Sequence, residues 1–306
     1  MDTLRPVWTR VVVLPGVGVL PAETPVLRAD DRGVLNGDGV FETVHVRAAR
    51  PWLLDGHLDR MARSAALLEL ALPPRAALAE LAAEACAAGP GQGCADRPGT
   101  DACAAGAGTG EAALRLVCTR GPDGAEPTVY ATLSPIPAGV LRERRDGVRV
   151  RTASLGVTAA GRVGLPWLLA GAKSLSYASN LAARRWATAN DADDVLWTST
   201  DGYALEAPTA NVVWLVDDTL CTVPAATTAI LAGVTADWLL AHAGSVGLGA
   251  AERMVTPAGL RTCDGVWLTS SLRGLCEVRA LDGDRLPPSP HTARLQDLLG
   301  YRSCTA

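Results

Sequence analysis

Residues Ala170–Asn180 read Ala-Gly-Ala-Lys-Ser-Leu-Ser-Tyr-Ala-Ser-Asn, and they hold the only lysine of the 306-residue chain. The chain's other basic side chains are all arginine. An arginine keeps its proton, whereas an amine can become a free base, attack a carbonyl and form an imine. The lone lysine, Lys173, is therefore predicted to form a Schiff base. The alternative is a chain whose basic positions drifted to arginine and left one surface lysine.

The composition limits the class of protein. A chain of 306 residues, 48% hydrophobic and 20% charged, has room for one large or two ordinary globular domains. Its net charge of −4 and its scattered arginines predict no binding to nucleic acid. No run approaches the roughly 18 apolar residues of a membrane helix. The apolar stretch Val11–Leu20 is interrupted by Pro15, Gly16 and Gly18, which predicts a strand, a turn and a strand rather than a signal peptide. We therefore expect a cytoplasmic protein.

The eight cysteines are far apart in the sequence, with no C-x-x-C pair and no histidine at zinc-site spacing. This pattern predicts free thiols and no metal site. Three of the cysteines lie in or beside Ala87–Gly110, a segment that is mostly Gly, Ala, Pro and Asp. Such a composition buries too little apolar surface to offset its ordering entropy. We expect a flexible surface insertion there.

Hydrophobic periodicity divides the chain into a small N-terminal domain (1–136), a linker (137–147) rich in proline, glycine and charge, and a larger C-terminal domain (148–306). Strands and helices are mixed in both domains, so the predicted class is α+β. The expected strands are Thr9–Leu14, Gly18–Leu20, Val40–Val46, Trp52–Leu54, Ala113–Thr119, Val129–Ser134, Val148–Ala153, Asp194–Thr198, Asn211–Val216, Thr219–Thr222 and Gly265–Ser270. The expected helices are 55–70, Leu78–Ala88, Leu175–Asn190, Val234–Ala243 and Thr292–Leu299.

Two side chains are candidates for the ring of an imine-forming cofactor. If a helix begins at Leu175, Tyr177 shares the face of Lys173 and its phenol can hydrogen-bond a cofactor oxygen, or else it simply packs. Glu206 lies in a turn between strands, where a carboxylate is by default solvated. If the cofactor is pyridoxal phosphate (PLP), however, its ring nitrogen needs an acidic partner in order to act as an electron sink. Glu206 would be that partner.

A phosphate-binding set is also present. Gly233 precedes a predicted helix whose first N–H groups lack intrahelical partners and attract anions, although Thr235 there also suits a simple helix cap. Ser271 follows the end of a predicted strand, and Arg60 follows His57 by three residues. Both are solvated surface residues in the alternative interpretation. Together these groups offer the guanidinium, hydroxyls and amides that a phosphate dianion needs.

Six motifs occur in one order along the chain and resemble those of the fold-type IV PLP enzymes. They are D-R-G-x-x-x-G-D-G-V-F-E-T (31–43), H-L-D-R (57–60), A-K-S-L-S-Y-x-S-N (172–180), D-G-Y-x-L-E-x-P-T-A-N (201–211), I-L-x-G-V-T (230–235) and T-S-S (269–271). The resemblance covers about residues 9–290. It implies a small N-terminal α/β domain and a larger C-terminal domain with a mixed, barrel-like sheet. It also implies a homodimer whose active site lies between the domains, with part contributed by the neighbouring subunit.

The resemblance implies a role for each candidate residue. Lys173 becomes the Schiff-base lysine and general base, and Glu206 the partner of the pyridine nitrogen. The other residues expected to bind the cofactor are Tyr177, Leu231 on the ring face, and Arg60, Val234, Thr235 and Ser271 around the phosphate. Phe41 is expected to border the substrate pocket, and the amides of Ser271 and Leu272 to hold a substrate carboxylate.

The family includes branched-chain aminotransferases, D-amino-acid aminotransferases and 4-amino-4-deoxychorismate lyases. The segment after Thr119-Arg120-Gly121 lacks the Arg-x-His pair of the D-amino-acid enzymes, and the pocket tyrosines of the branched-chain enzymes have no evident match. The motifs look most similar to actinobacterial aminodeoxychorismate lyases. The expected reaction converts 4-amino-4-deoxychorismate to 4-aminobenzoate and pyruvate, a step of folate biosynthesis. The alternatives are an aminotransferase of branched-chain or D-amino acids and a PLP-binding protein without catalytic activity.

Overall fold

The computed structural model describes residues 10–89 and 110–301. Most of the insertion predicted over 87–110 therefore lies outside the described residues. The chain forms two compact units. Unit 1 extends to Pro137 and also takes in Ala172–Ser176, whereas unit 2 comprises 138–171 and the residues from Tyr177 onward. The segment predicted as a linker is mainly a helix, α4 (Ala138–Asp146).

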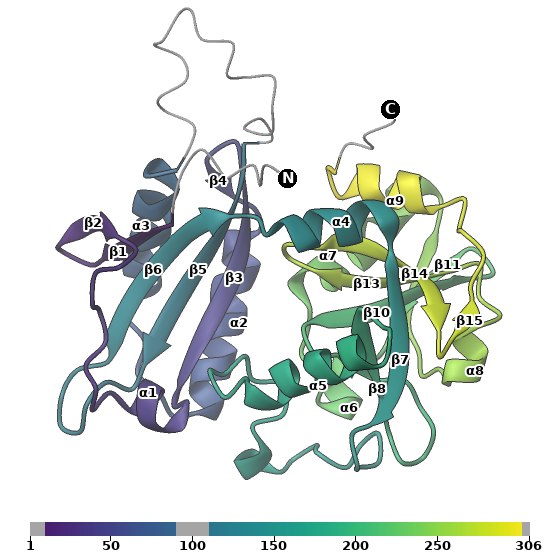
Figure 1. Ribbon diagram of the computed structural model, residues 1–306, viewed down its shortest axis with the longest axis horizontal. Helices are drawn as coiled ribbons and strands as arrows, with labels where there is room; N and C mark the ends of the chain where they lie inside the picture. Colours follow the sequence, from purple (N-terminus) through teal and green to yellow (C-terminus); the bar gives the residue numbers. More distant parts are fainter. Residues whose placement is uncertain (1–9, 90–109, 302–306) are drawn as a thin grey trace, which may run out of the picture. The chain divides into compact units, whose positions relative to one another are not determined.

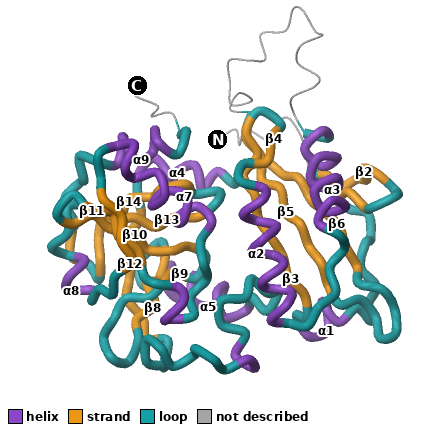
Figure 2. The backbone as a smooth tube through the Cα atoms, turned by 180° about the vertical axis from the view of Figure 1, so that it is seen from behind, coloured by secondary structure: helices purple, strands orange, loops and turns teal. Residues whose placement is uncertain are grey.

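Unit 1 is an antiparallel sheet, with strand order β2-β1-β6-β5-β3-β4 among the described residues, and helices α2 and α3 cover one of its faces (Figures 1 and 2). Its strands are β1 (Val11–Leu14), β2 (Gly18–Pro21), β3 (Gly39–Arg47), β4 (Arg50–Pro51), β5 (Glu111–Thr119) and β6 (Thr128–Pro135). Its helices are α1 (Arg32–Asn36), α2 (Leu54–Leu67) and α3 (Arg75–Ala87).

The long strand β3 shows how the sequence places polar groups in unit 1. Successive side chains of a strand point to opposite faces of the sheet. Val40, Val44 and Val46 join the hydrophobic core that α2 and α3 cover. Glu42 has the same parity as these valines and is completely buried. A carboxylate therefore lies in line with the core residues of β3, a position that only paired or hydrogen-bonded charges occupy.

Unit 2 is built on a larger mixed sheet with the path β12-β11-β10-β13-β14-β7-β8, to which β15 and β9 add short pairings. The pairs β11/β12, β14/β7 and β7/β8 are parallel. The strands are β7 (Val148–Ser154), β8 (Asp194–Thr198), β9 (Glu206–Ala207), β10 (Ala210–Val216), β11 (Thr219–Thr222), β12 (Gly249–Glu252), β13 (Gly265–Ser270), β14 (Gly274–Leu281) and β15 (Asp284–Arg285). The remaining helices are α5 (Ala178–Ala189), α6 (Ala225–Thr228), α7 (Val234–His242), α8 (Pro257–Leu260) and α9 (Thr292–Leu298), with 3-10 turns at Pro166–Leu168 and Ala243–Val246.

The α+β class is confirmed, and most predicted elements lie within a few residues of their expected bounds. The hairpin over Val11–Leu20 is present as β1 and β2. Several details of the prediction were wrong, among them the following. Leu54 begins helix α2 rather than ending a strand, α5 begins at Ala178 instead of Leu175, and strand β14 was missed. That strand carries Glu277 and Arg279 among its apolar residues, which obscured the strand pattern.

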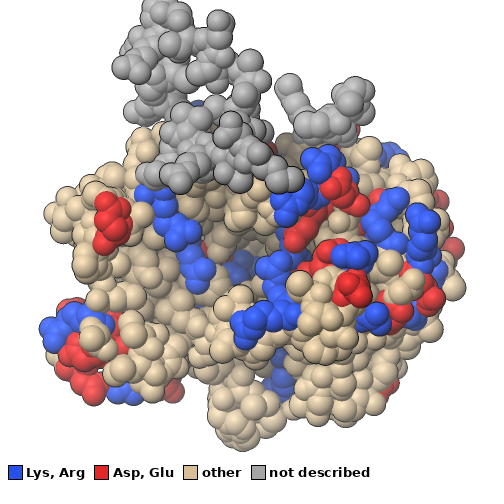
Figure 3. Space-filling model, in the orientation of Figure 1, with Lys and Arg blue, Asp and Glu red and all other residues tan. Residues whose placement is uncertain are grey.

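The surface of unit 2 carries charges of both signs. On the face drawn in Figure 3, basic and acidic side chains are interspersed. Within residues 10–89 and 110–301, no helix combines the length and the apolar character needed to cross a membrane.

One buried ion cluster links three elements of unit 2. Arg273, at the start of β14, is 4% exposed and its Nη1 lies 2.6 Å from Oδ2 of Asp194 on β8. Its Nε lies 2.8 Å from Oε2 of Glu143 on α4. The two carboxylates raise the pKa of Arg273, although burial by itself lowers it. This cluster attaches the helix that follows unit 1 to the sheet of unit 2.

We predict that Arg273→Met destabilises unit 2 by about 3–5 kcal/mol, because it leaves the fully buried Asp194 without its counter-charge. Chemical denaturation monitored by circular dichroism measures the change. Arg145→Met is the matched control, since Arg145 is an exposed arginine that pairs only with its neighbour Asp146 among the described ion pairs, and it should leave the unfolding midpoint unchanged. Equal midpoints for the two variants would contradict the prediction.

Candidate active site

Lys173 lies in a short extended segment of unit 1 rather than at the start of a helix. Its carbonyl accepts a hydrogen bond from the Phe41 N–H at 3.1 Å, and the Leu175 N–H donates to the Gly39 carbonyl at 2.8 Å. The Lys173 N–H donates to Oγ of Ser64 on α2 at 3.0 Å. Residues 172–176 therefore bind to the buried start of β3 and to one turn of α2, and these contacts fix the main chain of the lysine.

The structure corrects the prediction for Tyr177. Because α5 begins only at Ala178, Tyr177 and Lys173 do not share a helix face. Tyr177 belongs to unit 2, where its hydroxyl donates to the Pro208 carbonyl at 3.3 Å. That carbonyl also accepts from Asn180 Nδ2. Tyr177 thus contacts the loop that follows Glu206, and its role toward a cofactor stays a prediction.

The amine of Lys173 lies over an aromatic ring. Its Nζ is 4.3 Å from the centroid of Phe41, and the guanidinium carbon of Arg115 is 3.9 Å from the same centroid. Arg115 is an exposed residue on the otherwise buried strand β5. Sequence reasoning missed it, although a single arginine inside an apolar strand was the available signal. Unit 1 therefore groups an amine, an aromatic ring and a permanent cation.

Arg60 is not a solvated surface residue, because it is 7% exposed and paired with Glu42. Its Nε donates to Glu42 Oε1 at 2.7 Å and its Nη2 to Oε2 at 2.8 Å, a bidentate pair. His57, one helical turn earlier, places its Nδ1 2.7 Å from Oε2. The sequence motif H-L-D-R therefore supplies two of the three members of this cluster, and the glutamate of V-F-E-T supplies the third.

Burial and pairing set the charges of this cluster. Burial alone raises the pKa of Glu42, but the charge and hydrogen bonds of Arg60 outweigh it and lower the pKa to about 2. Burial lowers the pKa of His57 below its ordinary value of 6.5. At neutral pH the carboxylate is charged and the imidazole is neutral. Because a carboxylate only accepts hydrogen bonds, we infer that His57 carries its proton on Nδ1.

In unit 2, Glu206 is held by the loop that contains Leu231. The Leu231 N–H donates to Glu206 Oε2 at 3.1 Å. Arg162 Nη2 lies 3.9 Å from Oε1, and this nitrogen is buried without a hydrogen-bond partner. Glu206 is therefore a partly buried carboxylate beside a guanidinium rather than a solvated turn residue. The sequence gave no signal that Arg162 lies next to it.

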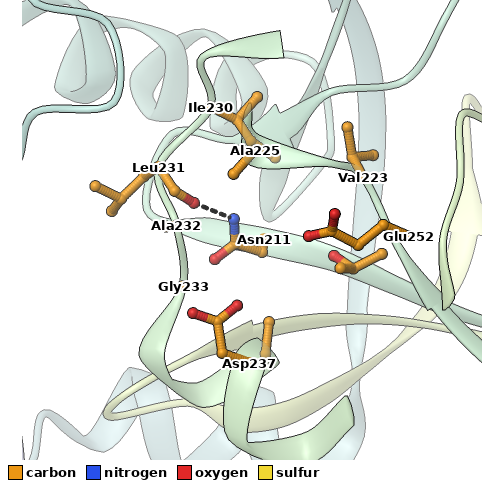
Figure 4. A pocket seen from close by; sticks show the side chains of 11 residues that line it. Asn211, Val223, Ala225, Ile230, Leu231, Ala232, Gly233, Asp237 and Glu252 are labelled. Carbon is orange, nitrogen blue, oxygen red and sulfur yellow. Dashed lines mark hydrogen bonds between the residues drawn. The ribbon is translucent and has the colours of Figure 1, made fainter. Parts of the chain in front are cut away.

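Asn211 holds the other side of the same loop. Its Nδ2 donates to the Leu231 carbonyl at 2.7 Å, as the dashed line in Figure 4 shows. Gly233 approaches Asn211 so closely that a Cβ at this position would overlap the amide oxygen of Asn211. The loop over residues 230–233 thus requires both the asparagine of the T-A-N motif and the glycine of the G-V-T motif, which explains why these residues occur together.

The predicted phosphate residues of unit 2 lie at a helix start and a strand end. Helix α7 begins at Val234 as predicted, and Thr235 is buried in its first turn. Ser271 follows β13 in the turn that leads into β14, with Leu272 beside it. Thr269, at the end of β13, is 1% exposed and its hydroxyl has no hydrogen-bond partner. A buried hydroxyl without a partner is costly unless a ligand or water completes it.

The candidate residues are divided between the units. Unit 1 contains Lys173, Phe41 and Arg60, and unit 2 contains Tyr177, Glu206, Leu231, Val234, Thr235, Ser271 and Leu272. Among the described residues, no cluster of histidine, cysteine and acidic side chains has the arrangement of a metal site.

Comparison with known proteins identifies the class. The profile of the class IV aminotransferases matches residues 39–281, and the chain belongs to this family. It is 39% identical over 290 residues to a bifunctional aminodeoxychorismate lyase / D-amino acid transaminase of Mycobacterium tuberculosis, covering 92% of this chain and 94% of that protein. The PLP-bound structure of a hypothetical aminotransferase from M. tuberculosis has a TM-score of 0.85 and 37% identity, covering 95% of this chain and 97% of the other. A 4-amino-4-deoxychorismate lyase from Pseudomonas aeruginosa has a TM-score of 0.70 and 30% identity, over 91% and 95% of the two chains.

The fold and the family define a PLP-dependent enzyme, as the sequence predicted. The residues of the site suit this cofactor. Glu206 is a carboxylate 3.9 Å from the Arg162 guanidinium. Thr269 has a buried hydroxyl without a hydrogen-bond partner, and Val234 begins a helix of nine residues. These are the acidic, hydroxyl and amide groups that a pyridine nitrogen and a phosphate require.

The lowered pKa values of Glu42 and His57 predict acid sensitivity. The unfolded His57 takes up a proton near pH 6.5 and the folded one does not, so stability should decrease as the pH falls below 6.5. The free energy of unfolding should decrease again below pH 4.5, because the unfolded Glu42 is protonated before the folded one. The Glu42 contribution to this loss reaches about 3 kcal/mol at pH 2. Denaturation midpoints measured between pH 7.5 and 2 test this. His57→Gln should flatten the first decrease, and an unchanged pH profile in that variant would refute the assignment.

Proposed function

We propose that this enzyme is an aminodeoxychorismate lyase that converts 4-amino-4-deoxychorismate to 4-aminobenzoate and pyruvate. The observation that carries the proposal is the group of Lys173, Phe41 and Arg115 in unit 1. The flat ring of Phe41 suits a cyclic substrate, and the guanidinium beside it suits a substrate that bears two carboxylates. The relative of M. tuberculosis with lyase in its name supports this reading.

Each residue has a defined task in the proposed reaction. PLP, when bound, supplies an electron sink conjugated to the substrate carbon that bears the amino group. The Lys173 amine removes the proton from that carbon, and the bond between the ring and the enolpyruvyl oxygen then breaks, which makes the ring aromatic. The same amine returns the proton to the departing enolate to give pyruvate. Glu206 holds a proton at the pyridine nitrogen, and the Arg162 guanidinium lies 3.9 Å from the carboxylate.

We assign the remaining residues to binding. Arg60, Val234, Thr235 and Ser271 hold the phosphate, Leu231 lies against the cofactor ring, and Tyr177 bonds a cofactor oxygen. Phe41 and the amides of Ser271 and Leu272 contact the substrate. We further propose that the enzyme works as a homodimer, as the family resemblance implies, and that it is cytoplasmic, as the sequence pattern suggests.

An aminotransferase of D-amino acids or branched-chain amino acids is the second candidate. The M. tuberculosis relative carries both activities in its name, and D-alanine aminotransferases of Bacillus licheniformis and Listeria are 25–27% identical to this chain. Removal of a proton beside the substrate nitrogen is common to both reactions, so Lys173 and Glu206 serve either one. The two functions differ in whether a keto acid is consumed.

The product assay separates these two functions. We predict that the purified enzyme with PLP releases pyruvate and 4-aminobenzoate in equal amounts from 4-amino-4-deoxychorismate, at the same rate with and without 2-oxoglutarate. Product formation that requires 2-oxoglutarate, or activity only toward amino acids, would replace the lyase proposal with the aminotransferase. A protein that binds PLP but turns over neither substrate would support a binding role alone.

We predict that Lys173→Arg abolishes turnover, by at least about 10³-fold, because arginine can neither form an imine nor accept the substrate proton. Borohydride treatment of the wild-type enzyme should fix one pyridoxyl group on the peptide that contains Lys173. The only other amine in the chain is the N-terminus, so peptide mapping distinguishes the two sites. Label on the N-terminal peptide, or a fully active variant with native circular dichroism, would exclude Lys173.

A further inference from the structure

The turn between β13 and β14 is held by its carbonyl oxygens. The Ser271 carbonyl accepts from the hydroxyl of Tyr301 at 3.1 Å. The Leu272 carbonyl accepts from Arg144 on α4, through Nε at 2.7 Å and through Nη2. The guanidinium of Arg144 also lies 4.4 Å from the ring centroid of Tyr301, so the two donors support each other. Two residues distant from the turn in the sequence thus bind two consecutive carbonyls.

Further contacts fix the donors in place. Gln296 on α9 donates to the Arg144 carbonyl at 3.2 Å and to the Leu275 carbonyl at 3.1 Å. Gly274 ends the turn with φ of 62°, and a Cβ there would overlap the ring of Tyr301. The side chain of Arg273 is committed to the buried cluster with Asp194 and Glu143. The turn has little freedom to rotate its peptide groups.

The direction of the carbonyls determines the direction of the amides. In a trans peptide unit the C=O and the following N–H point in opposite directions, because the unit is planar. The Ser271 carbonyl shares its unit with the Leu272 N–H, and the Leu272 carbonyl shares its unit with the Arg273 N–H. Since the carbonyls face Tyr301 and Arg144, these two consecutive N–H groups face away from them. Consecutive amides that point the same way form a binding site for anions.

We infer that Arg144 and Tyr301 are positioning residues that aim the Leu272 and Arg273 amides at an anionic group of the cofactor or the substrate. The inference rests on the proposed function, which places Ser271 and Leu272 in the binding site. It adds the Arg273 amide as a third anion donor of the turn. Neither Arg144 nor Tyr301 needs to touch the ligand, because both act through the orientation of the peptide groups.

Two variants test the inference. Tyr301→Phe removes the hydroxyl that donates to the Ser271 carbonyl and keeps the ring beside Arg144. Arg144→Met removes the two nitrogens that donate to the Leu272 carbonyl and keeps a side chain of similar length. Arg145→Met, on the adjacent exposed residue, is the matched control. We expect both test variants to weaken anion binding by about 10- to 100-fold, the range for a lost hydrogen bond to a charged group, with the control unchanged.

Pairs of ligands identify the anion. Titration of the apoenzyme with PLP and with pyridoxal, which lacks the phosphate, reports on the phosphate. Titration of the PLP-bound enzyme with 4-aminobenzoate and with aniline, which lacks the carboxylate, reports on the carboxylate. Weaker binding of either anionic ligand with unchanged binding of its neutral counterpart supports the inference and names the anion.

Two results would overturn the inference. Affinities within twofold of wild type in both variants would exclude a positioning role, and an equal loss for anionic and neutral ligands would show that the contacts serve stability only. Tyr301→Phe keeps the test decisive if Arg144→Met does not fold. If the wild-type protein bound no PLP, the proposed function would fail, and titration of the same variants with inorganic phosphate would still decide the inference.

Discussion

The pairing of residues 172–176 with the start of β3 is the constraint on which the site depends. The chain leaves unit 1 after Pro137, forms α4 and β7 of unit 2, and then returns to unit 1 for five residues before it re-enters unit 2 at Tyr177. Two main-chain hydrogen bonds with β3, and one that the Lys173 N–H donates to Ser64 Oγ, hold this return. The lysine is thereby fixed by its backbone, and its flexible side chain lies against the ring of Phe41. A fixed main chain holds the lysine in position, while its flexible side chain would still allow the amine to move between the groups that exchange a proton in the proposed reaction.

Both units bury charge in order to hold main-chain or side-chain donors in one orientation. In unit 1, Glu42 fixes the plane of the Arg60 guanidinium through two parallel hydrogen bonds. In unit 2, Arg273 donates to Asp194 and forms an ion pair with Glu143. A buried ion pair adds little net stability, since the desolvation of both groups offsets most of their attraction. The pair instead fixes orientation, because a planar guanidinium that is hydrogen-bonded on one edge holds its remaining N–H groups in fixed directions. This directionality is what recognition of phosphates and carboxylates requires.

The sequence predicted what depends on local pattern and missed what depends on tertiary contact. Periodicity placed most strands and helices, and the start of α7 at Val234 followed from Gly233. The predicted start of α5 was wrong. The local sequence around Leu175 favours a helix, but its N–H donates to the Gly39 carbonyl, a tertiary contact that local sequence does not reveal. Lys173 was singled out because its residue type is unique in the chain, and its role stays a prediction. Arg115, Arg162 and Asn211 were missed because their residue types are ordinary and only the fold brings them beside Phe41, Glu206 and the Leu231 loop.

The proposed roles of these residues are compatible with the two activities that the M. tuberculosis relative carries in its name. In the proposed function, proton removal by Lys173 with Glu206 at the ring nitrogen serves both reactions, so neither residue would discriminate between substrates. Discrimination requires groups that contact the part of the substrate that differs, which is a ring with two carboxylates in one case and an amino-acid side chain in the other. In unit 1, Phe41 lies beside the amine, and Arg115 lies over the same ring. On this proposal, selectivity between the two reactions would depend on a cation and a ring face, and both can change without disturbing the buried clusters that hold Arg60 and Arg273.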